Sequence, residues 1–379
     1  MSKLDDYRSE IDAIDDYLAR LLAKRMDVVL KVAQYKKENH LPVLHQNRED
    51  QVLERVSAAV KEEYRPSVRF LYSTIMDESK NYQNRQLVEP ESFYEELGLD
   101  VAEPIEKPTC LACQGVPGAY SGEAAAKFCP GAPVRYYPSF QDVFEAVDRG
   151  EAPYGILPIE NSNAGSVTQV YDLMKAYRFF IVRELKLPIC HNLLVRPGVS
   201  LAAVTDVYSH PQGLSQCQEF LRAHPEIVPH EYSNTAAAAK LVAESSEPIA
   251  SISSLGCAEL YGLTVAEPSI QDRAQNFTRF LCISRKPEIP SEGGKISIQF
   301  QLPHQTGSLY KILARFFSAS LNLTKIESRP LPGSDFEFIF YCDFTGNLHE
   351  AQVMALLSSL KKELQQFIFL GNYTELTLS

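Results

Sequence analysis

The sequence lacks the features that would assign it to a membrane or to nucleic acid. None of its apolar runs approaches the roughly 20 residues that span a bilayer, and its polar start, "MSKLDDYRSE", has no signal-peptide core. The net charge of −11 argues against nucleic acid or anionic membrane as the main partner. These absences predict a cytoplasmic protein. They leave small anionic substrates open, because a local cluster of Arg and Lys can outweigh the net charge.

Cysteine is also used sparingly, with eight scattered residues that do not form a disulfide framework in a chain of 379 residues. Cys110 and Cys113 in "CLAC" have a spacing found in metal and redox sites. They lie in a predicted strand, however, where positions three apart face opposite sides. No second Cys/His pair with ligand spacing accompanies them. Buried free thiols and the absence of a metal site are therefore expected.

The length predicts two or three domains, and the first is helical over residues 1–88. Apolar residues recur at threes and fours from Leu4 to Val32, Pro42 interrupts the pattern, and Pro66 opens a third helix. A first helix of about 35 residues is about 50 Å long. Its apolar stripe is too long to be buried by two shorter helices, so the sequence predicts a dimer.

The remaining chain changes its periodicity twice. Residues 89–108 are acidic and rich in proline, which is typical of a linker. Residues 109–285 alternate strand-like and helix-like segments and predict an α/β sheet domain. A second linker, "KPEIPSEGGK", precedes residues 295–379, whose strand–helix–strand–strand–helix–strand order predicts an α+β ferredoxin-like module. The predicted fold class is therefore multidomain.

Polar residues interrupt the apolar stripes of the helical domain. Arg25 and Lys36 lie on one face of the first helix, about 16 Å apart and about 20° apart around its axis. Ser79 and Gln83 end the apolar stripe of the third helix, and Arg48 and Glu49 open the second. Each residue alone is compatible with a solvated helix edge. Together they predict a polar pocket for a small anion inside a helix bundle.

At these positions the sequence resembles the all-helical chorismate mutase family, over about residues 4–86. The resemblance rests on "RSEIDAIDDYLARLLAKRMDVVLKVAQYKK", "NRE" and "DESKNYQ". It implies a crossed dimer and a set of substrate-binding residues: Arg8, Arg25, Lys36, Arg48, Glu49, Ser79 and Gln83. The Claisen rearrangement of chorismate, which this family catalyses, needs the dicarboxylate substrate held in a compact conformer. It also needs hydrogen-bond donors at the ether oxygen, a catalytic role that suits Lys36 and Gln83. It requires no metal and no cofactor. His45 departs from the family, which commonly has an acidic residue there.

In the middle segment, Glu160 and Asn161 follow a strand-like run and precede a loop of small and polar residues. A surface cap is one interpretation of this pair. The surrounding stretches "GVPGAYSGEAA", "PIENSNAGSV", "YSHPQGLSQC", "NTAAAA" and "QNFTRF" resemble prephenate dehydratase. Strand ends are where open α/β sheets bind ligands. The resemblance implies a substrate cleft with Glu160, Asn161, Ser209, Gln216 and Thr278. Arg279 and Phe280 complete the family motif and are counted among the substrate-binding residues. Thr278 is expected to be catalytic and to assist the departing hydroxyl; the group that supplies the proton stays open.

The tail resembles an ACT regulatory domain through "QTGSLYKILARF" and "IESRP". Gly307 lies at a predicted strand-to-helix turn, where a glycine lets the backbone approach a ligand closely. The resemblance implies a phenylalanine site formed by Gly307, Ser308, Leu309, Glu327, Ser328, Arg329 and Pro330. Tyr310 is bulkier than the residues that the family commonly has there. A purely structural role for both motifs is the alternative.

The three resemblances imply one bifunctional enzyme of phenylalanine biosynthesis. It would convert chorismate to prephenate and then prephenate to phenylpyruvate, with phenylalanine as feedback inhibitor and a homodimer or higher homo-oligomer as the assembly. Two alternatives stay open: a dehydratase that prefers arogenate, and a non-catalytic amino-acid-sensing regulator.

Overall fold

The computed structural model divides the chain into two compact units. It describes residues 2–39, 41, 46–87, 90–331, 337–364 and 366–377. Unit 1 comprises Met1–Leu99 and Ile296–Phe369, and unit 2 comprises Asp100–Lys295 and Leu370–Ser379. Pro42 and His45 lie outside the described residues. Within these ranges no helix combines the length and the apolar character needed to cross a membrane.

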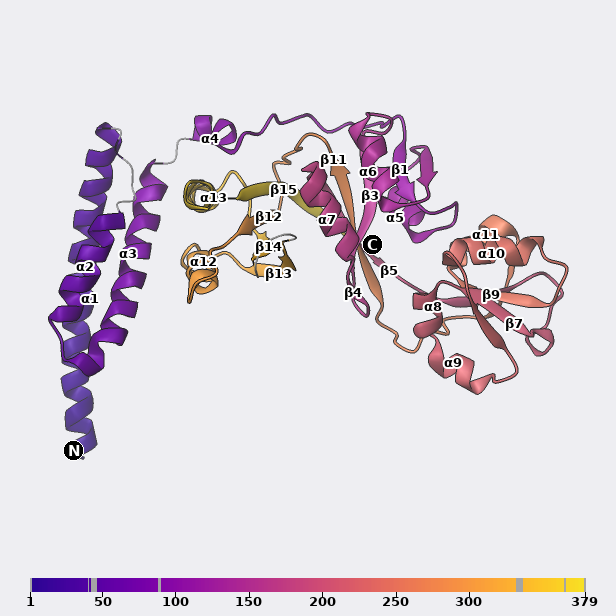
Figure 1. Cartoon of the computed structure of the whole chain (residues 1–379), viewed down its shortest axis with the longest axis horizontal. Coiled ribbons are helices and arrows are strands. Elements are labelled where there is room, and N and C mark those ends of the chain that lie inside the picture. Colours follow the sequence, from indigo (N-terminus) through magenta and orange to yellow (C-terminus); the bar gives the residue numbers. More distant parts are fainter. Residues whose placement is uncertain are drawn as a thin grey trace. The chain divides into compact units, whose positions relative to one another are not determined.

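Unit 1 begins with the helices α1 (Lys3–Glu38), α2 (Gln46–Ala58) and α3 (Arg65–Leu87), which lie side by side (Figure 1). Ser2 starts α1, because its Oγ accepts a hydrogen bond from the backbone N–H of Asp5. The short 3-10 helix η1 (Glu62–Tyr64) leads into α3. The α1 helix has the length that its periodicity predicts, at 36 residues.

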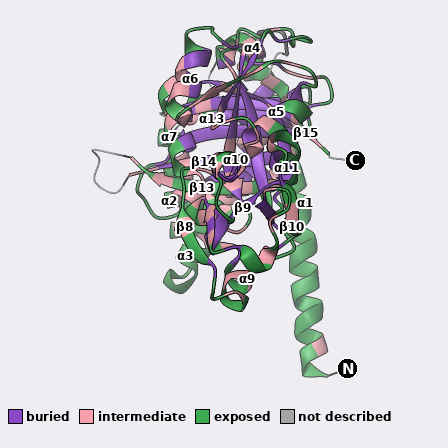
Figure 2. Cartoon of the chain, turned by 90° about the vertical axis from the view of Figure 1, so that its right-hand side faces the viewer, coloured by how far each residue is buried: buried purple, intermediate pink, exposed green. Residues whose placement is uncertain are grey.

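The apolar stripe of α1 is exposed along most of the helix (Figure 2). Ile14 and Leu21 are 57% and 61% exposed, whereas Val29 and Ala33 further along are buried. A stripe of large exposed apolar side chains marks a surface that another chain can cover.

The tail of unit 1 has the βαββαβ order expected for a ferredoxin-like module. Its elements are β12 (Lys295–Gln301), α12 (Ser308–Ser318), β13 (Leu323–Pro330), β14 (Phe338–Thr345), α13 (Ala351–Glu363) and β15 (Phe367–Leu376). The strands follow the order β13-β14-β12-β15, and the β13–β14 pair is antiparallel, with Ser328 opposite Phe340. Phe300, Phe316 and Phe344 are fully buried and form its core.

The region expected to be a linker contains a helix, α4 (Pro90–Leu97). Phe93 and Leu97 are buried, and α4 lies against α13, where Ser358 Oγ donates to Glu96 Oε1 at 2.6 Å. The prolines and acidic residues of this region thus obscured a short amphipathic segment. The α3 helix also contacts α12 and α13, and the rings of Phe70 and Tyr310 lie 5.6 Å apart.

Unit 2 contains a first lobe built on a mixed sheet. Its strands follow the order β5-β11-β3-β1-β2 and are β5 (Phe180–Pro188), β11 (Phe277–Ser284), β3 (Tyr154–Asn161), β1 (Leu111–Gln114) and β2 (Val134–Tyr137). The strand β1 is parallel to β2 and β3, while β11 is antiparallel to β3 and β5. The helices of this lobe are α5 (Tyr120–Phe128), α6 (Phe140–Asp148) and α7 (Thr168–Tyr177), and the short β4 (Gly165–Ser166) pairs with β3. The end of β15 lies parallel to β5.

The second lobe has its own sheet, which includes β7 and β9 (Figure 1). Its strands follow the order β10-β6-β9-β7-β8. The strands are β10 (Thr264–Glu267), β6 (Asn192–Val195), β9 (Ile249–Ser253), β7 (Asp206–Ser209) and β8 (Val228–Glu231). The 3-10 helix η2 (Leu201–Ala203) and the helices α8 (Pro211–Ser215), α9 (Gln218–Ala223), α10 (Thr235–Glu244) and α11 (Leu255–Tyr261) complete the lobe. Cys110 and Cys113, like most of the cysteines, are buried free thiols.

The strand-like segments of the sequence did not include β4, β5, β6, β8 and β10. The strand β5 carries Arg183, Glu184 and Lys186 between apolar residues. Such a mixture is typical of an exposed segment, yet Glu184 is fully buried. Its burial depends on cations supplied from distant parts of the chain, which no local pattern reveals.

Candidate active sites

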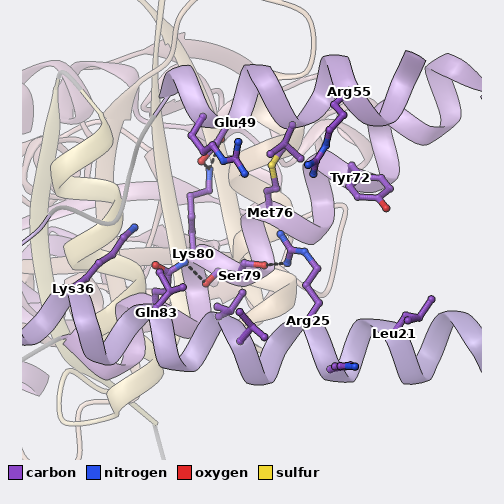
Figure 3. A pocket seen from close by; sticks show the side chains of 16 residues that line it. Leu21, Arg25, Lys36, Glu49, Arg55, Tyr72, Met76, Ser79, Lys80 and Gln83 are labelled. Carbon is purple, nitrogen blue, oxygen red and sulfur yellow. Dashed lines mark hydrogen bonds and ion pairs between the residues drawn. The ribbon is translucent and has the colours of Figure 1, made fainter. Parts of the chain in front are cut away.

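The helices α1, α2 and α3 line a cavity of about 640 Å³ (Figure 3). Val29, Val52 and Met76 supply apolar wall, and the polar residues predicted from the interrupted stripes gather around it: Arg25, Lys36, Arg48, Glu49, Ser79 and Gln83. Arg25 and Lys36 come from α1, Arg48 and Glu49 from α2, and Ser79 and Gln83 from α3. The cavity is therefore cationic on α1 and presents hydroxyl and amide groups on α3.

Hydrogen bonds hold the polar groups of α3 in place. The Arg25 guanidinium donates to Ser79 Oγ, which donates to the carbonyl of Ile75 at 2.6 Å. Gln83 Nε2 donates to the carbonyl of Ser79 at 3.2 Å. Gln83 Oε1 is buried and has no hydrogen-bond partner within the described part of the chain. A buried polar atom without a protein partner costs free energy, and a ligand that donates a hydrogen bond to it would remove this cost.

Partial burial affects both cations of α1. It lowers the pKa of Arg25, opposed by the nearby Tyr72. It also lowers the pKa of Lys36, where the charge of Glu49 acts in the opposite direction. Burial thus costs both cations part of their hydration, and an anion bound between them would offset this cost.

Sequence reasoning missed several residues that line this cavity: Lys24, Arg55, Tyr72 and Lys80. Lys80 Nζ lies 2.8 Å from Asp77 Oδ1 and 3.2 Å from Glu49 Oε1, so it joins α3 to α2. A signal existed, because Tyr72, Met76 and Lys80 follow one another at intervals of four on one helix face. Arg8, by contrast, does not line the cavity. Its guanidinium is largely exposed and lies 3.7 Å from Asp5.

In unit 2, Glu160 and Asn161 end β3, as predicted, and β11 places Thr278 and Arg279 opposite them. Asn161 is buried, and its Nδ2 donates to Asn276 Oδ1 at 2.8 Å and to Thr278 Oγ1 at 3.0 Å. Its Oδ1 accepts from the backbone N–H groups of Asn163 and Ala164 at 3.0 and 2.9 Å. Asn161 therefore fixes the loop after β3 and the hydroxyl of Thr278 together.

A buried ion cluster lies beside this group. Arg279 Nη2 lies 2.8 Å from Glu184 Oε2, and Lys295 Nζ lies 2.7 Å from Glu184 Oε1. Arg279 Nη1 is also 3.7 Å from Glu160 Oε2, and its Nη2 donates to Tyr373 Oη at 3.3 Å. Glu184 thus balances two cations, and Arg279 lies between Glu184 and Glu160.

A cavity of about 310 Å³ lies between the lobes of unit 2. Asn163 and Ala164 come from the first lobe, Gln216 from the second, and Asn276 from the connection between them. Gln216 Oε1 accepts from Asn276 Nδ2 at 2.9 Å and lies 2.9 Å from His191 Nε2. The predicted residue Gln216 is therefore tied to the Asn161–Thr278 group through Asn276, which sequence reasoning did not select.

Among the predicted dehydratase residues, Gln216 lines this cavity, whereas Glu160, Asn161, Thr278 and Arg279 at the ends of β3 and β11 are not part of its lining. Ser209 and Phe280 lie further away, inside the two lobes. Ser209 is fully buried, and its Oγ donates to the carbonyl of Ile252 at 2.8 Å, so it bonds within the second lobe. Phe280 packs in the core of the first lobe with Leu185 and Ile156. Its place on β11 directs the ring into this core and not into the cavity between the lobes.

In the tail module, Gly307 precedes α12 with a φ of 84°, a left-handed conformation that favours glycine. A cavity of about 440 Å³ adjoins it and is lined by residues that include Ser308, Leu309, Phe338 and Phe340. Glu327, Ser328, Arg329 and Pro330 lie on the neighbouring strand β13 and do not line this cavity within one chain. Tyr310 lies at the α3 contact and not in the cavity wall.

Comparison with known proteins gives a family for each enzyme-like region. Residues 7–84 match the family chorismate mutase type II, and residues 111–288 match the family prephenate dehydratase. The chain is 32% identical to the bifunctional chorismate mutase/prephenate dehydratase of Escherichia coli (strain K12), over 97% of this chain and 95% of that protein.

Other relatives resemble only the later part. Arogenate dehydratase 3, chloroplastic, from Arabidopsis thaliana is 37% identical over 69% of this chain and 66% of its own length. Among solved structures, prephenate dehydratase from Arthrobacter aurescens in complex with L-Phe has a TM-score of 0.64 and 31% identity, covering 70% of this chain and 90% of that chain. The match to the bifunctional enzyme extends over both regions. The chain belongs to the family of bifunctional chorismate mutase/prephenate dehydratases.

Proposed function

We propose that the cavity between α1, α2 and α3 is the chorismate mutase site and that the ends of β3 and β11 form the prephenate dehydratase site. The enzyme rearranges chorismate to prephenate and then converts prephenate to phenylpyruvate, as its family does. The observation that carries the mutase assignment is the convergence of cations, hydroxyl and amide groups from three helices on one cavity.

In the mutase site, the arginines bind the carboxylates of chorismate, and the Gln83 amide on α3 acts at the bond that breaks. Arg25 and Arg48 hold the two carboxylates of chorismate and thereby favour its compact conformer. Lys36 and Gln83 donate to the ether oxygen, where negative charge grows as the bond breaks. Gln83 can donate there because its amide is held at the cavity wall by the Ser79 carbonyl. Glu49 contacts the hydroxyl side of the substrate.

Arg8 completes this site from a second copy of the chain. Within one chain it lies outside the cavity and pairs only weakly with Asp5. It is about 25 Å along α1 from Arg25 and about 100° around the helix. The exposed apolar stripe of α1, including Ile14 and Leu21, gives a second copy a surface to cover. A crossed dimer buries this stripe and delivers Arg8 to the partner cavity.

In the dehydratase site, the driving force comes from formation of the aromatic ring, so the chain must orient the leaving carboxylate and assist the departing hydroxyl. Thr278 is the group nearest to that second role, because Asn161 donates to its Oγ1 and so leaves the Thr278 proton free to point to substrate. Arg279 and Gln216 bind the anionic parts of prephenate, and Glu160 lies beside Arg279.

The tail is an ACT regulatory domain that binds phenylalanine and inhibits the dehydratase. Its βαββαβ order and the left-handed Gly307 at the start of α12 support this assignment. The relative from Arthrobacter aurescens was solved in complex with L-Phe. Since Glu327, Ser328 and Arg329 do not line the cavity near Ser308 within one chain, they contribute from a neighbouring module.

The substrate preference is tested by supplying chorismate, prephenate and arogenate separately to the purified protein. Phenylpyruvate from the first two, with little phenylalanine from arogenate, is the expected result. Arogenate preference is the second candidate, because relatives of the dehydratase region are arogenate dehydratases. Faster turnover of arogenate would establish that alternative. Failure to form any product from chorismate would overturn the mutase assignment.

A further inference from the structure

Asn276 lies just before β11, is 2% exposed and lines the cavity between the lobes of unit 2. It is hydrogen-bonded on both sides of its amide, to Asn161 and to Gln216. The roles proposed above for Thr278 and Gln216 leave Asn276 without a function. Because Asn276 lies between them, it matters which end of its side-chain amide is the oxygen and which is the nitrogen.

That direction follows from the backbone of the loop after β3. Asn161 Oδ1 receives two backbone N–H groups, from Asn163 and Ala164. A backbone N–H only donates, so this end of the Asn161 amide is its oxygen. Its nitrogen therefore lies at the other end and donates to Asn276 at 2.8 Å. The atom of Asn276 that receives this bond is in turn an oxygen, because a nitrogen there would not accept.

The same reasoning extends to the second lobe. With Asn276 Oδ1 facing Asn161, Asn276 Nδ2 faces Gln216 at 2.9 Å and needs an acceptor, which is Gln216 Oε1. His191 Nε2 is 2.9 Å from the same oxygen and therefore carries its proton there. The buried His191 Nδ1 is then unprotonated, and it has no hydrogen-bond partner within the described residues. Burial also lowers the pKa of His191, which favours this neutral ring.

We propose that Asn276 is a positioning residue of the dehydratase, which fixes the Gln216 amide with its oxygen inward so that its N–H groups are presented to the anionic substrate in the cavity between the lobes. This inference rests on the proposed binding role of Gln216. Without Asn276 the Gln216 oxygen loses one of its two donors, and the other, His191 Nε2, becomes an acceptor when the neutral ring changes tautomer. The Gln216 amide could then rotate and turn its oxygen toward the substrate carboxylate. The substrate carboxylate would then face the Gln216 oxygen, which repels it, in place of an N–H donor, with no change in side-chain volume.

The test is Asn276→Asp, because an aspartate can reproduce the asparagine bonds in only one protonation state. One carboxyl oxygen still accepts from Asn161 Nδ2. The other faces Gln216 Oε1 and can donate only when it is protonated. The protonated form is present at pH below the pKa of the new carboxyl, so the orientation of Gln216 should be kept at low pH and lost as the pH rises through that pKa.

The expected result is a dehydratase kcat/KM close to wild type at the acidic end and a loss of about tenfold or more at the alkaline end, consistent with one misplaced hydrogen bond of about 1.4 kcal/mol. Asn276→Ala should show a similar loss at every pH. Asn347→Asp, which adds the same charge in unit 1, where Asn347 Oδ1 accepts from the backbone N–H of His349, should keep the wild-type pH profile.

A double variant with Gln216→Ala distinguishes an effect of Asn276 on the orientation of Gln216 from a general effect of Asn276 on folding. In Gln216→Ala the amide to be oriented is gone, so adding Asn276→Asp should introduce no pH-dependent step. The mutase rate and the thermal midpoint, measured on the same samples, should not follow the step. A wild-type pH profile for Asn276→Asp would overturn the proposal. So would a step that persists with Gln216→Ala, or one that coincides with a fall in the thermal midpoint. If Gln216→Ala alone leaves dehydration unchanged, the binding role of Gln216 is what fails.

Discussion

Arg279 Nη2 lies 2.8 Å from Oε2 of the fully buried Glu184. Glu184 is the counter-charge for Lys295 as well, at 2.7 Å. Removing one partner of a buried ionic group leaves charges in the interior that solvent cannot stabilise. The short distance between Arg279 and Glu184 therefore makes the dehydratase unit sensitive to a residue that contacts no substrate.

Glu184→Ala should destabilise unit 2 by about 3–5 kcal/mol, because Arg279 and Lys295 lose their nearest counter-charge. Their other carboxylates, Glu160 and Glu375, each lie 3.7 Å away. The urea midpoint for loss of dehydratase activity should fall, while the mutase activity of the same sample reports on unit 1. Lys186→Ala is the matched control: its ion pair with Glu375 is about half exposed, and such pairs contribute only about 0–1 kcal/mol. Equal urea midpoints for the two variants would show that the buried cluster is not important for stability.

The two chemistries should be separable by substitution. Lys36→Ala removes a cation from the cavity in unit 1 and should abolish prephenate formation, while supplied prephenate is still dehydrated at nearly the normal rate. Thr278→Ala should do the reverse and accumulate prephenate from chorismate. Following chorismate loss and phenylpyruvate formation in parallel checks this. Equal damage to both activities by each variant, in folded protein, would require a shared or strongly coupled site.

Mixed dimers test whether the mutase site contains residues of two chains. Random mixing of Arg8→Ala with Lys36→Ala subunits gives one hybrid site with both lesions and one with neither, so about a quarter of the wild-type mutase activity should return. Lys36→Ala with Gln83→Ala is the control pair, because both residues line the cavity of one chain and no hybrid site escapes both lesions. Absence of recovery after verified subunit exchange would contradict the two-chain site.

The mutase should lose activity at an alkaline pH below the ordinary range of lysine. Burial lowers the pKa of Lys36, with Glu49 opposing the shift. The ammonium form is the one that donates to the ether oxygen, so activity is present below this lowered pKa and declines as the pH rises through it. A kcat/KM profile for chorismate measures the decline, and Lys36→Arg should move it to higher pH. An unchanged alkaline limb in Lys36→Arg would assign the titration to another group.

Phenylalanine should bind the full-length chain in calorimetry and inhibit dehydration at millimolar or lower concentration. Inhibition requires tighter binding to the less active state, and a preference of about 1.4 kcal/mol changes that equilibrium about tenfold. Gly307→Ala should weaken binding, because it forces a side chain into the left-handed region at a φ of 84°. Gly294→Ala is the control, since a Cβ there meets no atom within 4 Å. No calorimetric signal would remove the regulatory assignment.

Shortening the chain near Arg285 is a poor alternative test of that regulation. The dehydratase unit includes Lys295 and residues 370–379, and Tyr373 accepts a hydrogen bond from Arg279. A shortened chain would lose Lys295, the partner of Glu184, together with the C-terminal module. Loss of activity would then report on the ion cluster and not on phenylalanine.

The helical and sheet regions could be predicted because their signals are local. The stripe of α3 placed Ser79 and Gln83 on the cavity, and the end of an apolar strand placed Glu160 and Asn161 at the edge of a sheet. Glu184 and Asn276 could not be predicted in this way. The sequence around both residues is that of an ordinary exposed segment. Their importance arises from partners more than 100 residues away in the chain, in the pairs Glu184–Lys295 and Asn161–Asn276.

The two units are interleaved along the chain, because residues 296–369 of unit 1 separate Lys295 from the last segment of unit 2. The segment Thr374–Leu376 of β15 pairs with β5. It can form this pair only after the ends of the inserted residues 296–369 have come together. Closure of a long loop costs conformational entropy before the contact forms. Refolding of the dehydratase should therefore lag behind formation of the helices. A mutation that slows the inserted module should delay the return of dehydratase activity without changing its final level.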